Sequence, residues 1–415
     1  MVQMRIPFGT VAVTDITRKL INECLDSGRL SCGRLVRQFE ERFAQCVGAK
    51  EAVAVSSGTD ADILAIAVLY ENGAQRGDEV IVPALSFVAT GNAVLHAGFT
   101  PIFVDVDPRT FNIDVSRIEA AITVRTRAIM PVHLMGKPAD MDTINAIARR
   151  HHLLVVEDAA EAHGAIYKGR NVGTLGDLAA YSLYVAHIIT TGEGGIVVTD
   201  NEAYAEVLRS LRAHGRACKC KQCVSNLTSG YCHRRFNNAY GADIRFQFER
   251  IGYSSKMNEL EAAIGLGALQ IYNTILTKRH DNLMRLIDGF QRFGGLFDTF
   301  EEAPWERIGP HAFPFIVKEE APFSREEVML YLEENGVDAR TLFSSIPTQC
   351  GGYAFLGHRL GDFPVAEMIG RQGIHIGVHQ DVSPEDIQWF IGLMERFIHQ
   401  VDRRGVARAA VNCKF

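Results

Sequence analysis

Short apolar runs alternate with segments of helical spacing along the first half of this chain. In Gly33–Val47 an apolar residue returns every four positions from Leu35 onwards, which predicts an amphipathic helix. Ala52–Ser56 is an apolar run of strand length, and it passes through a turn into a helix predicted over Ala61–Tyr70. These elements start a repeating pattern of strand and helix.

The alternation continues through residue 157. The predicted strands are Glu79–Val82, Pro101–Val104, Ala128–Pro131 and Leu153–Glu157, and the predicted helices are Ala89–His96, Val115–Ala121 and Met141–Arg150. Alternation at this pitch predicts an α/β fold with a mostly parallel central sheet that helices cover on both faces. Such sheets bind ligands at the carboxyl ends of their strands, so we expect a site in the turns that follow them.

The second half of the chain predicts a smaller domain. Its further elements are strands at Leu178–Tyr184, Gly195–Val198 and Phe313–Val317, and helices at Glu202–His214, Asn258–Leu276 and Arg325–Asn335. The long helix over Asn258–Leu276 is expected to lead from one domain to the other. We therefore predict a large domain over residues 1–275 and a small C-terminal α/β domain over residues 276–415.

Length and charge exclude several classes of function. At 415 residues the chain is long enough for two domains with well-buried cores. A net charge of −6 gives no broad basic surface, which argues against nucleic acid as a partner. No apolar run reaches the roughly 18–20 residues that span a bilayer, and the first residues lack the apolar stretch of a signal peptide. We expect a cytoplasmic enzyme with no membrane partner.

Four of the nine cysteines lie within fifteen residues. Cys218, Cys220, Cys223 and Cys232 form the pattern C-x-C-x2-C-x8-C in a loop over residues 216–236. In a reducing compartment such a cluster predicts a metal site rather than disulfides. Four thiolates in one loop can bind zinc tetrahedrally or hold an iron–sulfur cluster, and the spacing alone leaves both open.

Polar or aromatic residues follow several of the predicted strands. Backbone N–H groups and hydroxyls in Ser56–Thr59 suit a phosphate at a helix N-terminus, although such a segment in isolation is usually only a turn. Asp158 follows an apolar strand, where a buried carboxylate either pairs with a cation or caps a helix. Phe87, taken alone, is typical of a core residue.

Five separate segments resemble, in order and spacing, the sugar aminotransferases of the DegT/DnrJ/EryC1/StrS family, which use pyridoxal phosphate (PLP). They are Ser56–Thr59, Pro83–Thr90, Glu157–Gly164, Ser182–Gly195 and Gly252–Glu259. The resemblance extends over roughly residues 30–275. It implies the fold type I, aspartate aminotransferase-like architecture of PLP-dependent transferases, and homodimers with active sites at the interface.

The resemblance also implies a role for individual residues. The cofactor phosphate would be bound by Ser57, Gly58, Thr59 and Ser182. Phe87 would stack on the pyridine ring, Asp158 would pair with the protonated pyridine nitrogen, and Glu161 would contact the phenolic oxygen. The cofactor of the partner subunit would be reached by Ser254 and Lys256. The family commonly has glutamine at the position of Glu161 and asparagine at that of Ser254. This chain departs from the pattern at both.

The largest departure is His187, which stands where the family keeps the lysine that holds the cofactor as a Schiff base. Imidazole cannot form that bond, but it can move protons near neutral pH. The same exchange marks the 3-dehydratases of nucleotide-linked 4-keto-6-deoxy sugars, which bind pyridoxamine phosphate (PMP) without a covalent bond. The resemblance therefore implies that His187 is the catalytic base. A degenerate site or a core histidine is the alternative.

The cysteine loop resembles that of the iron–sulfur 3-dehydrases of CDP-4-keto-6-deoxyglucose. Those enzymes take one ligand from the segment after Asp158, where this chain has Ala159 and Ala160, so Cys223 is expected to supply a ligand here. The resemblance favours a [2Fe–2S] over a [4Fe–4S] cluster, with zinc as the alternative, and a flavin-dependent reductase or a ferredoxin as electron donor. Lys219 and Lys221 either solvate the loop or help an acidic donor to dock.

These features predict PMP-dependent, iron–sulfur-assisted C3 dehydration and deoxygenation of a 4-keto hexose. The substrate would be a nucleotide-sugar or a sugar-nucleoside. Two alternatives stay open: a redox-free PMP-dependent 3-dehydratase whose cysteine loop binds zinc, and a non-catalytic, degenerate aminotransferase scaffold.

Overall fold

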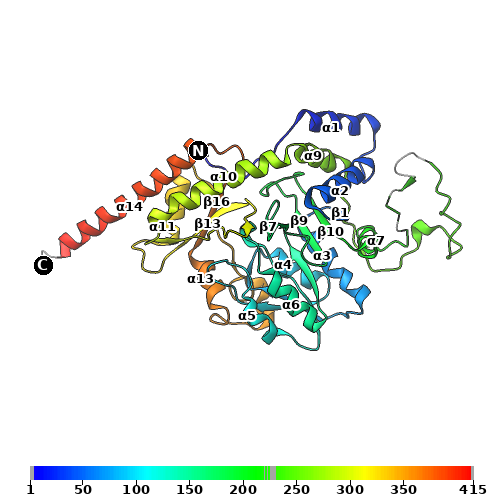
Figure 1. The fold of residues 1–415 in the computed structure, drawn as a ribbon, viewed down its shortest axis with the longest axis horizontal. Coiled ribbons are helices and arrows are strands. Elements are labelled where there is room, and N and C mark those ends of the chain that lie inside the picture. Colours follow the sequence, from blue (N-terminus) through cyan, green and yellow to red (C-terminus); the bar gives the residue numbers. More distant parts are fainter. Residues whose placement is uncertain (1–3, 219, 222, 225–229, 413–415) are drawn as a thin grey trace.

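A seven-stranded sheet lies at the centre of the computed structural model, which describes residues 4–218, 220–221, 223–224 and 230–412 (Figure 1). The strand order is β1 (Glu51–Val55), β10 (Gly195–Thr199), β9 (Leu178–Ser182), β6 (Leu154–Asp158), β5 (Thr126–Ile129), β2 (Glu79–Pro83) and β4 (Thr100–Val104). Neighbours from β9 to β4 are parallel, whereas β10 runs antiparallel to both β1 and β9. The predicted mostly parallel α/β sheet is confirmed.

Helices cover both faces of the sheet because each strand buries alternate side chains on opposite sides. The helices of this part are α1 (Asp15–Ser27), α2 (Arg34–Val47), α3 (Gly58–Ala67), α4 (Ala89–His96), α5 (Val115–Ile118), α6 (Met141–His151), α7 (Glu202–Leu211) and α9 (Glu259–Gln270). In β1, Val53 and Val55 belong to the core beneath α3 and α4, whereas Ala52 and Ala54 belong to the core beneath α2, α6 and α9.

Beyond α9, helix α10 (Tyr272–Phe290) leads to a smaller antiparallel sheet. Its strand order is β11 (Phe297–Asp298), β13 (Ala312–Val317), β16 (Gly373–Gly377) and β14 (Ala339–Thr341), accompanied by α11 (Arg325–Glu334), α12 (Ile346–Gln349), α13 (Pro364–Gln372) and α14 (Pro384–Asn412). Two short pairings tie it to the large sheet's loops: β12 (Glu306–Arg307) with β7 (Ile166–Tyr167), and β15 (Ser344–Ser345) with β3 (Leu85–Ser86). The domain boundary at residue 275 stays a prediction.

Among the predicted helices that end at other residues in the structure, two break at a change of backbone conformation. The helix expected over Asn258–Leu276 is divided into α9 and α10, because Ile271 leaves the helical conformation at φ −113° and ψ 19°. The helix expected over Glu202–His214 ends at Leu211, and His214 has a positive φ of 66°. No glycine or proline stands at Ile271 or between Leu211 and His214, so the sequence does not mark either break. In the part of the chain that is described, no helix is both long and apolar enough to cross a membrane.

Candidate functional site

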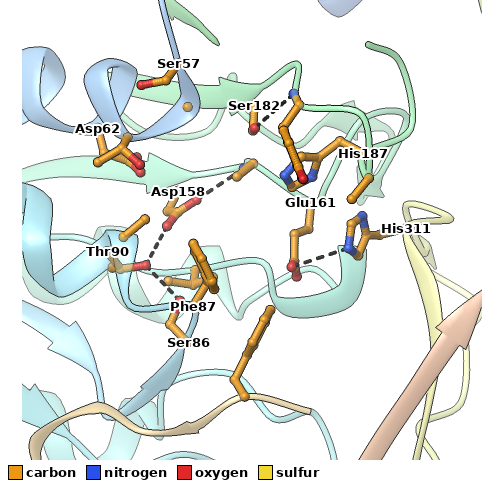
Figure 2. A pocket seen from close by; sticks show the side chains of 18 of the residues that line it. Ser57, Asp62, Ser86, Phe87, Thr90, Asp158, Glu161, Ser182, His187 and His311 are labelled. Atoms are coloured by element: carbon orange, nitrogen blue, oxygen red, sulfur yellow. Dashed lines mark hydrogen bonds and ion pairs between the residues drawn. The ribbon is translucent and has the colours of Figure 1, made fainter. Parts of the chain in front are cut away.

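A cavity of about 560 Å³ opens beside the carboxyl ends of β1, β6 and β9 (Figure 2). It is lined by eight of the residues for which the sequence implied a role: Ser57, Gly58, Thr59, Phe87, Asp158, Glu161, Ser182 and His187. Ser254 and Lys256 are exposed on this chain and lie outside that lining. Strand ends and the loop between β9 and β10 therefore bring most of the predicted site together.

The N-terminus of α3 forms a corner suited to an anion. Ser57 caps the helix, and its Oγ accepts the N–H of Asp60 at 3.0 Å. A Cβ atom at Gly58 would lie only 2.6 Å from the Cβ of Ser182, so this close approach requires glycine. The hydroxyls of Ser57, Thr59 and Ser182 line the same corner. With the positive end of the helix dipole, they favour a phosphate group.

Asp158 is the last residue of β6 and is buried in the wall of the cavity. Its Oδ2 accepts a hydrogen bond from Thr90 Oγ1 at 2.7 Å, and its Oδ1 accepts one from the Ala160 N–H at 3.2 Å. Burial raises the pKa of this carboxyl group. A cation beside it would offset the desolvation, and the protonated pyridine nitrogen of PLP or PMP is such a cation. The carboxylate thus fits the cofactor that the sequence implied.

Glu161 stands where the family commonly has glutamine, and its surroundings explain how a glutamate can serve in the place of that glutamine. Its Oε2 accepts the Met135 N–H at 2.7 Å, and its Oε1 lies 3.5 Å from His311 Nε2. Burial, reinforced by the nearby Asp158, raises the pKa of Glu161 to about 8. Glu161 is therefore a neutral carboxylic acid at pH 7, and its O–H can donate a hydrogen bond as a glutamine amide would.

His187 lies in the loop between β9 and β10, and its side chain lines the cavity (Figure 2). Its ring centroid is 5.0 Å from that of His311, with 35° between the ring planes. The Nδ1 atom is buried and has no hydrogen-bond partner among the described residues. Burial, followed by the nearby His163 and Arg279, lowers the pKa of His187 to about 3. The imidazole is therefore uncharged at neutral pH, and as a base it is weaker than the near-neutral pKa predicted from the sequence implies.

Several lining residues were not predicted from the sequence. They are Asp62, Thr90, His311, Arg340, Phe343 and His375. The pairing of β15 with β3 places Phe343 next to Phe87, with ring centroids 5.7 Å apart. Phe87 itself is 58% exposed, which suits a ring that borders a cavity and not a core residue. No local motif could identify most of these residues, because they come from the smaller sheet and its connections.

The described cysteines of the loop lie outside this cavity. The Sγ atoms of Cys218 and Cys220 are 3.8 Å apart. Cys218, Cys220 and Cys223 border a second cavity of about 310 Å³, whereas Cys232 is not part of its lining. Among the residues that the structure describes, no group of three or more Cys, His, Asp or Glu side chains is close enough to hold a metal. The four-cysteine metal site stays a prediction.

Residues 13–395 match the DegT/DnrJ/EryC1/StrS aminotransferase family. The GDP-perosamine synthase of Caulobacter vibrioides is 36% identical over 386 residues, covering 92% of this chain and 95% of that protein. The dTDP-4-dehydro-2,6-dideoxy-D-glucose 3-dehydratase of Saccharopolyspora spinosa is 33% identical over 403 residues, covering 94% of this chain and 86% of that protein. The structure of E. coli GDP-4-keto-6-deoxy-D-mannose-3-dehydratase with bound hydrated PLP has a TM-score of 0.83 and 28% sequence identity, covering 94% of this chain and 100% of that chain. The chain has the PLP-dependent aminotransferase-like fold and belongs to the DegT/DnrJ/EryC1/StrS aminotransferase family.

Proposed function

We propose that this enzyme removes the C3 hydroxyl group of a nucleotide-linked 4-keto hexose, with PMP bound non-covalently and His187 as the catalytic base. The observation that carries the proposal is the composition of the cavity wall. Among the described residues, the lining includes His187 and Asp158 but no lysine. An aminotransferase of this family needs a lysine amine there to hold PLP covalently.

The similar proteins are compatible with this class of reaction, but they do not distinguish it from the other reactions of the family. They include a perosamine synthase and two 3-dehydratases, one of them acting on a GDP-linked 4-keto-6-deoxy sugar and seen with hydrated PLP. Histidine in place of lysine is what favours dehydration for this chain. A 4-keto sugar linked to a nucleotide is accordingly the substrate class that we propose.

Five residues of the cavity wall would then have a task in this reaction. When bound, PMP supplies an amine for the C4 ketone and a ring that accepts electrons. Asp158 would hold a proton at the pyridine nitrogen, and Ser57, Thr59 and Ser182 would bind the phosphate. His187 would take a proton at the C4′ carbon of the bound cofactor and, as imidazolium, would donate it to the departing C3 hydroxyl, which would leave as water.

We also propose that the cysteine loop holds a [2Fe–2S] cluster, with zinc as the alternative, and that single electrons reach it from a flavin-dependent reductase or a ferredoxin. The supporting feature is the set of thiols around the second cavity. Lys221 forms an ion pair with Glu51, which favours a structural role for that lysine. Lys219 lies outside the described residues. Exposed Ser254 and Lys256 would complete the partner's cofactor site in a cytoplasmic homodimer.

The test of the proposed reaction uses anaerobically purified protein, PMP and a nucleotide-linked 4-keto-6-deoxyhexose. Mass spectrometry should show PMP-dependent loss of water from the sugar, and loss of the C3 oxygen with net reduction when a reductase is added. Formation of a 4-amino sugar from PLP and glutamate, without loss of the C3 hydroxyl, would contradict the proposal.

The pH dependence should report the protonation of Glu161. Because burial raises its pKa to about 8, Glu161 donates a hydrogen bond below that pH and loses the proton above it. We expect kcat/KM to fall above pH 8 in the wild type and to stay level there in Glu161→Gln. Glu193→Gln, at an exposed carboxylate that lines the same cavity, should keep the wild-type profile. If kcat/KM still fell above pH 8 in Glu161→Gln, the fall would be due to the titration of another group.

A further inference from the structure

Glu161 is held by two segments that are far apart in the sequence. Its Oε2 accepts the Met135 N–H at 2.7 Å, and its Oε1 lies 3.5 Å from Nε2 of His311, which directly precedes β13 (Figure 2). Both side chains are buried, with Glu161 6% and His311 3% exposed. His311 therefore faces a residue that is expected to touch the cofactor, although no sequence motif gave it a role.

The two segments are also fixed to each other. Met135 and Gly136 both have a positive φ, of 53° and 80°. The carbonyl oxygen of Gly136 accepts the N–H of Gly309, two residues before His311, at 2.8 Å. A Cβ atom at Gly136 would lie 1.8 Å from Gly309 O, so this close approach requires glycine. The backbone thus holds the Met135 N–H and His311 at set positions around one carboxyl group.

The imidazole of His311 is fixed by its own neighbours. Arg279 is fully buried and donates from Nε to Pro310 O at 2.9 Å and from Nη2 to His311 O at 2.8 Å. The ring centroid of His311 lies 5.8 Å from that of Phe8, edge to face, and 5.0 Å from that of His187. In a close-packed interior these contacts restrict the ring to the orientation in which Nε2 faces Glu161.

The Nδ1 atom of His311 indicates which ring nitrogen carries the proton. It is buried and has no hydrogen-bond partner among the described residues. Burial, followed by the nearby His187 and Arg279, lowers the pKa of His311 well below its usual value, so the ring is neutral and has one N–H. A buried N–H without an acceptor is rarer in proteins than an acceptor with an unused lone pair. The proton therefore belongs on Nε2, where it faces Oε1 of Glu161.

The proton of Glu161 is then left for another acceptor. Burial, reinforced by the nearby Asp158, raises the pKa of Glu161 to about 8, so the carboxyl group carries a proton at pH 7. The Met135 N–H and the His311 Nε2–H both donate to this group, so neither can accept its proton. Glu161 lines the cavity in which the cofactor is expected to bind. Its O–H is therefore available to an acceptor in that cavity.

We propose that His311 is a positioning residue, whose Nε2–H donates to Glu161 and thereby directs the Glu161 proton to the phenolic oxygen of the cofactor. The inference rests on the cofactor site of the proposed function, but it does not depend on loss of water from the sugar. Asp158 is the charged neighbour of Glu161. The titratable and charged groups near His311, apart from Glu161, are Arg279, His163, His187 and His375.

The first test follows the protonation of Glu161 in the full chain by infrared spectroscopy. The carboxylic acid band that is absent from Glu161→Gln should titrate near pH 8 in the wild type. A hydrogen bond stabilises an ionised acceptor more than a neutral one, so His311→Leu should raise this midpoint by about one pH unit. His311→Gln keeps an N–H donor and should restore the midpoint. His375→Leu, at another buried histidine of the cavity lining, should leave it unchanged.

Two results of this titration would overturn the inference. An unchanged midpoint in His311→Leu would show that His311 makes no hydrogen bond to Glu161, and a lower midpoint would show that Glu161 donates to the ring. NMR of wild-type protein labelled at the histidine nitrogens does not depend on the fold of His311→Leu. The His311 signal, assigned by its absence in His311→Gln, should show the proton on Nε2. A proton on Nδ1 would also overturn the inference.

Addition of PMP tests where the Glu161 proton points. The acid band should move to lower frequency when PMP binds, and the Kd for PMP should rise about fivefold in His311→Leu but not in His311→Gln, as loss of one hydrogen bond predicts. An unshifted band with PMP bound would overturn the direction of the proton. Protein that binds no PMP would overturn the cofactor site as well. Because no sugar is present, absence of water loss in the separate sugar assay would overturn only the reaction.

Discussion

Replacement of His187 by asparagine is expected to lower PMP-dependent loss of water by about 10²–10⁴-fold, the usual contribution of a positioned acid or base. Asparagine is polar but has no nitrogen that titrates near neutral pH. Burial keeps the imidazole uncharged, with a pKa of about 3, and its buried Nδ1 has no hydrogen-bond partner among the described residues. Exchange of the C4′ hydrogen of PMP with deuterated solvent, followed by NMR, should fall in parallel. Undiminished exchange would remove His187 from the mechanism.

The affinity for PMP separates this effect from a damaged site. The groups that hold the cofactor, Asp158 and the hydroxyls at the start of α3, are unchanged in His187→Asn, so the Kd for PMP should stay nearly constant. His187→Lys is the matched control. It restores an amine at the family position and should bind PLP covalently, which gives visible absorbance. Borohydride reduction should then leave the cofactor permanently attached to residue 187. Absence of that adduct would show that residue 187 does not face the cofactor.

The fold class was predictable because each buried strand is a continuous apolar run between helices. The direction of β10 was not, since all five of its residues are buried and an apolar run carries no sign of its direction. The interruption at Ile271 was hidden for a related reason. Ile271 has a φ of −113°, and the residue at the break is neither glycine nor proline.

The candidate site was predictable where one strand end carries its residue, as at Ser57, Asp158 and Ser182. His311 and Phe343 lie far from these motifs along the chain and reach the cavity through the smaller sheet and the pairing of β15 with β3. A local sequence pattern cannot show that residues so far apart in the chain line the same cavity.

Replacement of Asp158 by asparagine is expected to lower activity by about 10²–10³-fold, as does removal of one preorganised electrostatic group. An amide cannot neutralise a protonated pyridine nitrogen, so the cofactor ring would accept electrons less well. The amide oxygen can still accept the hydrogen bond that Thr90 Oγ1 now donates at 2.7 Å, which preserves the local packing. The absorbance of bound PMP, titrated with pH, should show a lower pKa for the pyridine nitrogen.

Asp62 provides the control that separates charge from packing. It is buried and lines the same cavity, and burial together with the neighbouring Asp158 raises its pKa well above the usual value. Burial disfavours the charged form of Asp62, and asparagine has nearly the same size and shape, so this substitution tests packing in the cavity wall. We expect Asp62→Asn to have a much smaller effect than Asp158→Asn and to leave the pyridine titration unchanged. If both variants lost activity equally, with no shift in that titration, the loss would reflect packing in the cavity wall, and Asp158 would not be the partner of the pyridine nitrogen.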